Sequence, residues 1–145
     1  MSPPTISDNH IPHRILVVED GFDNQRLIAY ILRKAGAEVS VAKNGQVAVD
    51  LALAATPAGS SFDIILMDIQ MPVMDGYEAT KRLRSAGCVT PIIALTANCT
   101  AEHRQKCLDA GCDDYMTKPF DWAVLLKRLV QRGSAHAPKK NGLLG

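Results

Sequence analysis

The sequence lacks the features of a membrane-spanning or secreted protein. Its longest apolar runs are far shorter than the roughly 18–20 residues that cross a bilayer. The first residues, Met-Ser-Pro-Pro, offer neither the basic segment nor the apolar segment of a signal peptide. Charge of either sign is not in excess, because 16 basic and 15 acidic residues give a formal net charge of +1. We therefore expect no direct binding to nucleic acid or to an anionic membrane.

Cysteine is scarce and irregularly spaced. The chain has four cysteines and no Cys-x-x-Cys pair: Cys88, Cys99, Cys107 and Cys112. This spacing argues against a zinc site, and the low cysteine density argues against a disulfide framework. We expect four reduced thiols that serve as small apolar side chains, and a cytoplasmic protein.

The length and composition indicate one folded domain with a short tail at each end. Of the 145 residues, 47% are hydrophobic and 21% are charged, which is ordinary for a globular protein. Residues 1–13 are rich in Pro, Ser, Asn and His, and residues 134–145 show no hydrophobic periodicity. We therefore expect a domain over 14–133 between a flexible N-terminal tail (1–13) and a flexible C-terminal tail (134–145).

Five short predicted strands alternate with segments that repeat apolar residues at helical spacing. Three of the strands are continuous apolar runs, at 15–18, 64–67 and 92–95, and two further short strands are expected at 39–41 and 113–116. Helix starts are marked by residues that can cap a first turn: Asn44, Asp75 (with Glu78 three residues later), Thr100 and Asp121. Gly36 and Gly111 stand where helices would end. This order predicts a doubly wound α/β fold, a flavodoxin-like (βα)5 domain whose five-stranded parallel sheet has the strand order 2-1-3-4-5.

Polar side chains follow four of the predicted strands. Glu19 and Asp20 follow the first strand, Asp68 follows the third, Thr96 follows the fourth, and Lys118 comes shortly after the fifth. Taken singly, each is an ordinary turn former, helix cap or surface charge. The carboxyl ends of parallel strands meet at one edge of a sheet, which is where doubly wound folds bind ligands. We therefore expect these five side chains to share one crevice.

The chemistry of such a crevice favours phosphoryl transfer. Neighbouring carboxylates resist ionisation unless a cation joins them, and hard oxygen ligands suit Mg²⁺. Lys118 would place a positive charge on the other side. A carboxylate beside Mg²⁺ and a lysine can attack a phosphoryl group and form an aspartyl phosphate. The hydroxyl of Thr96 can hydrogen-bond one of the phosphoryl oxygens.

Four strings of sequence resemble those of one known family. They are Val-Glu-Asp at 18–20, Leu-Met-Asp-Ile-Gln-Met-Pro-Val-Met-Asp-Gly at 66–76, Ala-Leu-Thr-Ala-Asn at 94–98, and Ala-Gly-Cys-Asp-Asp-Tyr-Met-Thr-Lys-Pro at 110–119. In this order they resemble the receiver domain of two-component response regulators, over about 14–132. The wording is most similar to receiver domains of hybrid sensor histidine kinases.

The resemblance implies a role for each matching acidic residue. Asp68 is the implied phosphoacceptor, and Asp20 and Asp68 are implied ligands of Mg²⁺. Glu19 is expected to hold the metal through a water molecule, and the backbone carbonyl of Gln70 is the remaining implied protein ligand. One departure is Gly21, where hybrid-type domains usually carry Asn. Because glycine has no side chain to hydrogen-bond, the rigidity of this loop is left open. The expected metal site is not affected.

The resemblance also implies residues that sense the phosphoryl group. Thr96 and Lys118 are expected to contact it, with Tyr115 as the aromatic switch partner of Thr96. The peptide bond between Lys118 and Pro119 is expected to be cis, which would fix the direction of the lysine. Gln70 and Asn98 flank the site and are expected to tune hydrolysis.

The implied function is signal relay. The donor would be a phosphohistidine on a sensor histidine kinase or a histidine phosphotransfer domain. The chain would catalyse only its own phosphorylation and dephosphorylation, with kinase activity in a partner or in a missing domain. The face formed by the helix over 101–110, the strand over 113–116 and the last helix is expected to report the state. The same face is expected to allow a weak homodimer.

Three other functions compete with this interpretation. A phosphatase of the haloacid dehalogenase type needs an acid two residues after its nucleophile, where this chain has Gln70. A flavodoxin that binds FMN needs a phosphate loop after the first strand, where Glu19 and Asp20 would repel phosphate. A receiver-like module without phosphorylation would be expected to lack part of the acidic set or the lysine. The sequence leaves open a stand-alone regulator or a piece of a hybrid kinase.

Overall fold

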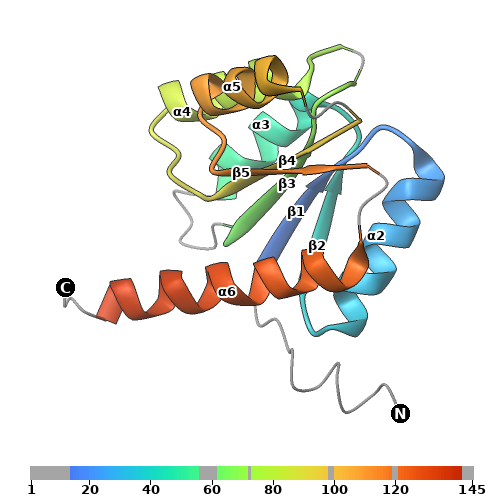
Figure 1. Cartoon of the computed structure of the whole chain (residues 1–145), viewed down its shortest axis with the longest axis vertical. Helices are drawn as coiled ribbons and strands as arrows, with labels where there is room; N and C mark the ends of the chain where they lie inside the picture. The colour runs from blue at the N-terminus through green and yellow to red at the C-terminus, as the bar shows by residue number, and fades with distance from the viewer. Residues whose placement is uncertain (1–13, 56–61, 72, 98–99, 119–120, 142–145) are drawn as a thin grey trace.

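The computed structural model describes residues 14–55, 62–71, 73–97, 100–118 and 121–141. In these residues a five-stranded parallel sheet lies between two layers of helices (Figure 1). The strands lie in the order β2-β1-β3-β4-β5, with bounds β1 (Arg14–Val18), β2 (Glu38–Ala42), β3 (Ile64–Asp68), β4 (Ile92–Thr96) and β5 (Asp114–Thr117). The helices are α2 (Phe22–Lys34), α3 (Gly45–Ala55), α4 (Gly76–Ser85), α5 (Ala101–Ala110) and α6 (Trp122–Asn141). The predicted flavodoxin-like fold and strand order are confirmed.

Each face of the sheet packs against its own hydrophobic core. Successive residues of a strand point to opposite faces, so the continuous apolar runs of β1, β3 and β4 supply both cores at once. On one face, α2 and α6 cover a core that includes Val17, Leu66 and Leu125. On the other face, α3, α4 and α5 cover a core that includes Leu16, Met67 and Leu83. This double cover explains why the predicted strands are apolar without alternation.

The predicted helix caps are confirmed by their hydrogen bonds. Asn44 Oδ1 accepts from the N–H of Val47 at 2.9 Å, and Asp75 Oδ1 accepts from Glu78 at 2.9 Å. Thr100 Oγ1 accepts from the third residue of α5 at 3.2 Å, and Asp121 Oδ1 accepts from the second residue of α6 at 2.8 Å. Because capping satisfies donors that the helix leaves unpaired, these side chains fix where the helices start.

The last helix extends past the predicted end of the domain at residue 133. Helix α6 continues to Asn141, and the flexibility expected for residues 134–145 stays a prediction. Extending an existing helix costs less than starting one, which lets the helix continue beyond the residues that pack, although Pro138 lacks the N–H that a helix interior uses. The predictions for residues 1–13, the loop 56–61, Asn98, Pro119 and residues 142–145 lie outside the described residues.

The loop that leaves β3 is held close to the strand. The N–H of Gly76 donates to the carbonyl of Ile69 at 2.9 Å. A Cβ atom on Gly76 would lie 2.5 Å from the carbonyl oxygen of Asp68, so this approach requires glycine. The start of α4 is therefore packed directly against the end of β3. Among the described residues, no helix combines the length and apolar character needed to cross a membrane.

Candidate phosphoacceptor and metal site

The sheet brings the predicted polar residues to one edge. Asp68 is the last residue of β3 and pairs in register with Leu95 of β4. Thr96 is the last residue of β4 and pairs with Thr117 of β5, directly before Lys118. The N–H of Lys118 donates to the carbonyl of Thr96 at 2.7 Å. Parallel register therefore places the end of each strand at one level, as predicted.

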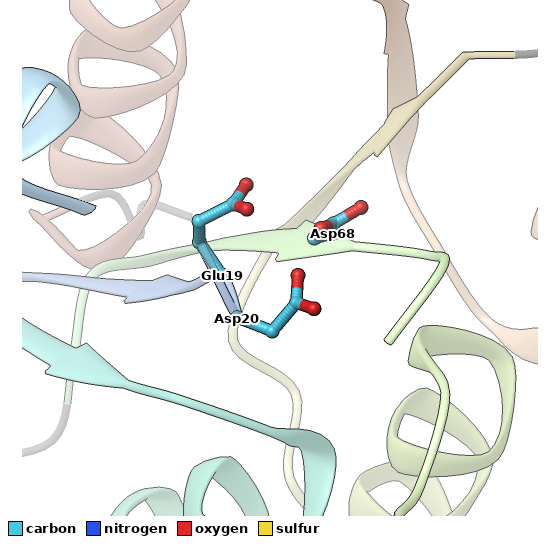
Figure 2. Close-up of side chains that lie close together, drawn as sticks. All are labelled: Glu19, Asp20 and Asp68. Carbon is cyan, nitrogen blue, oxygen red and sulfur yellow. The ribbon is translucent and has the colours of Figure 1, made fainter. Parts of the chain in front are cut away.

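Three carboxyl groups meet at this edge. One oxygen from each of Glu19, Asp20 and Asp68 lies within 4.8 Å of the others. Figure 2 shows the three side chains gathered at the ends of β1 and β3. Glu19 and Asp68 are each 2% exposed, whereas Asp20 is exposed to solvent. The cluster is therefore open on the side of Asp20 and closed around the other two.

Glu19 is held in place from several directions. Its Oε2 accepts from the N–H of Gly21 at 3.0 Å and from Asn24 Nδ2 at 3.5 Å, and its backbone carbonyl accepts from Gln25 Nε2 at 2.6 Å. The N–H of Glu19 also donates to the carbonyl of Ala42 at the end of β2. The backbone N–H of Gly21 thus fixes the loop, and the side chain of Gln25 makes a second hydrogen bond to Glu19. The loop is ordered by hydrogen bonds that do not need a side chain at position 21.

Lys118 lies between the two buried carboxylates. Its Nζ is 3.1 Å from Asp68 Oδ1 and 3.4 Å from Glu19 Oε1. Burial by itself would lower the pKa of Lys118, but its attraction and hydrogen bonds to these two carboxylates are larger together and raise it. Lys118 therefore stays charged, and it gives the acidic crevice one fixed cation.

The environment of Asp68 favours its neutral form. Burial raises the pKa of Asp68 to about 6, and repulsion from Glu19 adds to this rise. The Lys118 ammonium and the N–H of Gln70, which donates to Asp68 Oδ1 at 3.3 Å, act in the opposite direction. Asp68 is therefore ionised at neutral pH but more basic than an ordinary aspartate.

The donor set fits a hard divalent cation. Three carboxylates face one ammonium, so the cluster carries excess negative charge when all are ionised. Carboxylate and carbonyl oxygens are ligands that Mg²⁺ prefers, and Mg²⁺ commonly keeps water molecules on its open side. The exposed Asp20 leaves room for such waters, and Gln70, two residues after Asp68, brings a backbone carbonyl to the same loop.

Thr96 and Tyr115 occupy different environments beside the site. Thr96 is 2% exposed at the end of β4. Tyr115 is half-buried on β5, and its hydroxyl accepts a hydrogen bond from Arg104 Nη1 of α5 at 3.1 Å. The Arg104 guanidinium also lies 5.9 Å from the centre of the Tyr115 ring. The phenol of Tyr115 is therefore tied to α5.

A shallow hollow beside the acidic cluster was not foreseen from the sequence. Its volume is about 350 Å³, and it is lined by Ile69, Gln70, Met71, Asp75, Tyr77, Thr96 and His103.

Three residues near the site were also not predicted from the sequence: Asn24, Gln25 and Arg104. A signal for Asn24 and Gln25 was present, because the first turn of a helix that follows an acidic pair lies next to that pair. Arg104 carried no signal, because its contact joins α5 to a strand that follows it.

Comparison with known proteins gives a consistent result. Residues 15–130 match the family described as the response regulator receiver domain. The chain is 45% identical, over 124 residues, to hybrid signal transduction histidine kinase M of Dictyostelium discoideum. That match covers 80% of this chain and 5% of the kinase, so the chain spans a small part of this relative.

Solved structures of similar chains share the fold. The receiver domain of sensor histidine kinase PA1611 from Pseudomonas aeruginosa PAO1, with a magnesium ion in its active-site cleft, is 41% identical with a TM-score of 0.74. The match covers 84% of this chain and 98% of that one. The receiver domain of Ssk1 from Saccharomyces cerevisiae, crystallised with the phosphotransfer protein Ypd1, matches at 33% identity and a TM-score of 0.77. Here the coverage is 86% of this chain and 90% of that one.

Proposed function

Because the chain belongs to the response regulator receiver domain family, it is a phosphoacceptor domain of two-component signalling, and we propose that Asp68 accepts the phosphoryl group. The observation that carries this proposal is the contact between Asp68 and Lys118 inside a cluster of three carboxyl groups. A lysine and a metal on opposite sides of a carboxylate would neutralise the charge of a transferring phosphoryl group.

The proposed reaction moves a phosphoryl group from a histidine to Asp68. An ionised oxygen of Asp68 attacks phosphorus while the bond from phosphorus to the donor imidazole nitrogen breaks. The imidazole keeps the electron pair of that bond and takes up a proton. In the metal-free fold burial raises the pKa of Asp68 to about 6, so the carboxylate that attacks is already ionised at neutral pH. Water later attacks the acyl phosphate and restores the carboxylate.

The metal in this proposal is Mg²⁺. Glu19, Asp20, Asp68 and the backbone carbonyl of Gln70 would hold it, with Glu19 acting through water. When bound, Mg²⁺ would supply positive charge to the phosphoryl oxygens. The magnesium ion in the cleft of the PA1611 receiver domain supports this assignment.

Lys118 and Thr96 would recognise the product. Lys118 already bonds Asp68 and would transfer that contact to a phosphoryl oxygen, and Thr96 would hydrogen-bond another. Movement of Thr96 would then make room for Tyr115 to turn inward. Once turned inward, Tyr115 would lose its hydrogen bond to Arg104. Phosphorylation would in this way shift an existing conformational equilibrium without creating a new fold.

The site argues against the alternative functions. A dehalogenase-type phosphatase would need an acid at position 70, and the glutamine there cannot exchange a proton. A flavodoxin would bind a phosphate where β1 ends, but Glu19 and Asp20 place two carboxyl groups there. The set of acceptor, acidic pair and lysine is present and gathered, so a receiver-like module without phosphorylation is not favoured. We propose that the chain has no separate small-molecule turnover.

We propose a cytoplasmic protein whose partner is a sensor histidine kinase or a histidine phosphotransfer domain. The complex of Ypd1 with the Ssk1 receiver domain supports a partner of this class. The similarity to a hybrid kinase of Dictyostelium discoideum supports a kinase in the same chain or in a partner. Kinase activity, in either case, lies outside the receiver domain.

A labelling experiment tests the proposed function. The full chain is incubated with acetyl phosphate or phosphoramidate and Mg²⁺, and its intact mass is measured. We expect one phosphoryl adduct, lost in Asp68→Asn and in excess EDTA. Asp75→Asn is the matched control, because asparagine also caps a helix and Asp75 is exposed. An adduct that persists in Asp68→Asn, or that does not need a divalent cation, would overturn the proposal.

A further inference from the structure

The turn that ends α5 has a cysteine at each of its two ends, Cys107 and Cys112. The N–H of Cys112 donates to the carbonyl of Cys107 at 3.0 Å, and the N–H of Gly111 donates to Leu108 at 3.0 Å. Gly111 has a φ of 115°, in the left-handed region. These three features define a Schellman motif, whose first and sixth residues commonly bring their side chains into contact. Here these residues are Cys107 and Cys112, and both belong to the same buried core cluster.

Both thiols are enclosed between α4, α5 and the start of β5. Cys107 is 1% exposed and Cys112 is 6% exposed. Cys112 Sγ lies 3.8 Å from Thr80 Oγ1 of α4. Burial raises the pKa of both cysteines, to about 12 for Cys112, so both thiols stay protonated in the closed protein. The pair is therefore protected from reagents until this part of the structure opens.

Helix α5 is the element whose opening would expose the pair. Of its ten residues only two are buried, Cys107 and Ala110. A helix with so few buried side chains opens at lower free energy than the core strands do. Because one of those residues is Cys107, a side chain that anchors α5 is also one that the proposed disulfide would use.

We propose that Cys107 and Cys112 are a site of reversible oxidation, forming an intramolecular disulfide by exchange with a low-molecular-weight disulfide such as oxidised glutathione. The proposal does not rest on the phosphoacceptor function. The disulfide would fasten the end of α5 to the residues that lead into β5. Arg104, which holds Tyr115, lies on the same helix, so oxidation would restrain the helix beside the switch residue.

The exchange balances in two steps. The thiolate of one cysteine attacks a sulfur of the small disulfide, whose S–S bond breaks, and one small thiolate leaves and takes up a proton. The second cysteine then attacks the protein sulfur of the mixed disulfide and releases the second small thiol. The two protein sulfurs lose two electrons in total, and these reduce the small disulfide to two thiols.

The sequence allows the oxidised pair to be read by peptide mass. Trypsin cleaves after Lys106 and Lys127 but spares the bond between Lys118 and proline, so Cys107 and Cys112 share peptide 107–127. The other two cysteines share peptide 85–104, which is an internal control. The full chain is equilibrated in glutathione buffers of graded ratio, natively and in concentrated urea. Free thiols are then alkylated before digestion.

Equilibrium is approached from both the reduced and the oxidised chain, so slow access to buried thiols does not decide the result. We expect the disulfide in peptide 107–127 to resist reduction by glutathione at least about tenfold better in the native chain than in urea. Peptide 85–104 should show no such gain. In Cys112→Ser, peptide 107–127 should carry only a mixed disulfide with glutathione.

Two results would overturn the proposal. One is a disulfide in peptide 107–127 that is reduced as easily in the native chain as in urea, because the fold would then not favour it. The other is an oxidised chain that loses its native circular dichroism on return to buffer, because the fold would then exclude the bond. Both use the unmodified sequence, so neither depends on the folding of a variant.

Discussion

Asp68 is a buried carboxyl group, and the metal-free fold disfavours its charged form. Burial and the neighbouring Glu19 outweigh the attraction of Lys118, so the pKa of Asp68 rises from 3.8 to about 6. A group whose pKa is raised on folding contributes stability at low pH, and that contribution is lost as pH rises through the folded value. The site therefore costs stability at the pH where it would react.

Asp68→Asn is expected to stabilise the metal-free protein at neutral pH. Removing the charge should raise the free energy of unfolding by about 1–3 kcal/mol at pH 7.5, because the shift of the pKa sets the upper end. Urea denaturation in EDTA measures the difference. It should shrink toward pH 4, where the wild-type carboxyl is protonated in the folded state. A difference that stays constant from pH 4 to 7.5 would contradict this origin.

Val73 is expected to be a strained position in the loop that leaves β3. Its φ is 70°, in the left-handed region, and its side chain is 82% exposed, so packing does not offset the strain. Val73→Gly should raise the free energy of unfolding by about 0.5–1 kcal/mol, after the entropy cost of glycine. Val73→Ala keeps a Cβ and should gain less. Thermal unfolding measures both, and a lower midpoint for the glycine variant would contradict the prediction.

At the scale of elements, Arg84 joins three segments of the structure. Its guanidinium donates to the carbonyls of Gly111, Cys88 and Thr90 and pairs with Asp113 Oδ2, each at 2.9 Å. These partners belong to the turn after α5 and to the segment between α4 and β4. One side chain of α4 therefore satisfies carbonyl groups that the helix and strand ends leave unpaired.

Arg84→Met is expected to destabilise the fold while a neighbouring arginine is tolerated. Loss of several charge-assisted hydrogen bonds at a partly buried site should lower the free energy of unfolding by about 2–4 kcal/mol. Arg82→Met is the matched control on the same helix. Arg82 makes one exposed pair with Glu78, so its loss should stay within about 0.5 kcal/mol. Equal losses in urea denaturation would contradict the role given to Arg84.

The elements that the sequence predicted well are those whose signal is local. The apolar runs that became β1, β3 and β4 are buried on both faces, so their pattern was unambiguous. The caps at Asn44 and Asp75 act within one helical turn and were also predictable. Helix α6 continues past the predicted domain boundary, because apolar periodicity marks only the part of a helix that packs.

The contacts that the sequence did not predict depend on how the elements are placed in the fold. Arg84 looks like an ordinary surface charge on an amphipathic helix, and its contact with the turn after α5 is 27 residues away in the sequence. The contact of Arg104 with Tyr115 spans 11 residues and joins α5 to β5, whereas Gln25 lies only six residues from Glu19. The gathering of the acidic residues was predictable because parallel strands align their carboxyl ends. The roles of Thr96, Lys118 and Tyr115, and the cis peptide at Pro119, stay predictions.

At the scale of the whole molecule, Mg²⁺ is expected to stabilise the fold. A ligand that binds only the native state raises the free energy of unfolding, by about 1.4 kcal/mol at roughly ten times its Kd. Thermal unfolding should therefore shift upward as MgCl₂ is added at constant ionic strength. Asp20→Asn should abolish the shift, and because Asp20 is exposed the variant should still fold. An equal shift in the variant would mean that Mg²⁺ binds elsewhere.

The response of the whole domain to phosphorylation stays a prediction. The face built from α5, β5 and α6 is expected to report the state of Asp68, and a weak homodimer through it is also expected. Helix α5 has few buried residues, which suits an element that shifts. Sedimentation with and without Mg²⁺ and beryllofluoride would measure the dimer.

The most direct measurement is a crystal structure of the full chain with Mg²⁺ and beryllofluoride, an analogue of the acyl phosphate. We expect the beryllofluoride on a carboxylate oxygen of Asp68, a metal ion beside Glu19 and Asp20, and Lys118 turned toward the fluorides. An empty crevice, or beryllofluoride on a different carboxylate, would contradict the assignment of Asp68 as the phosphoacceptor.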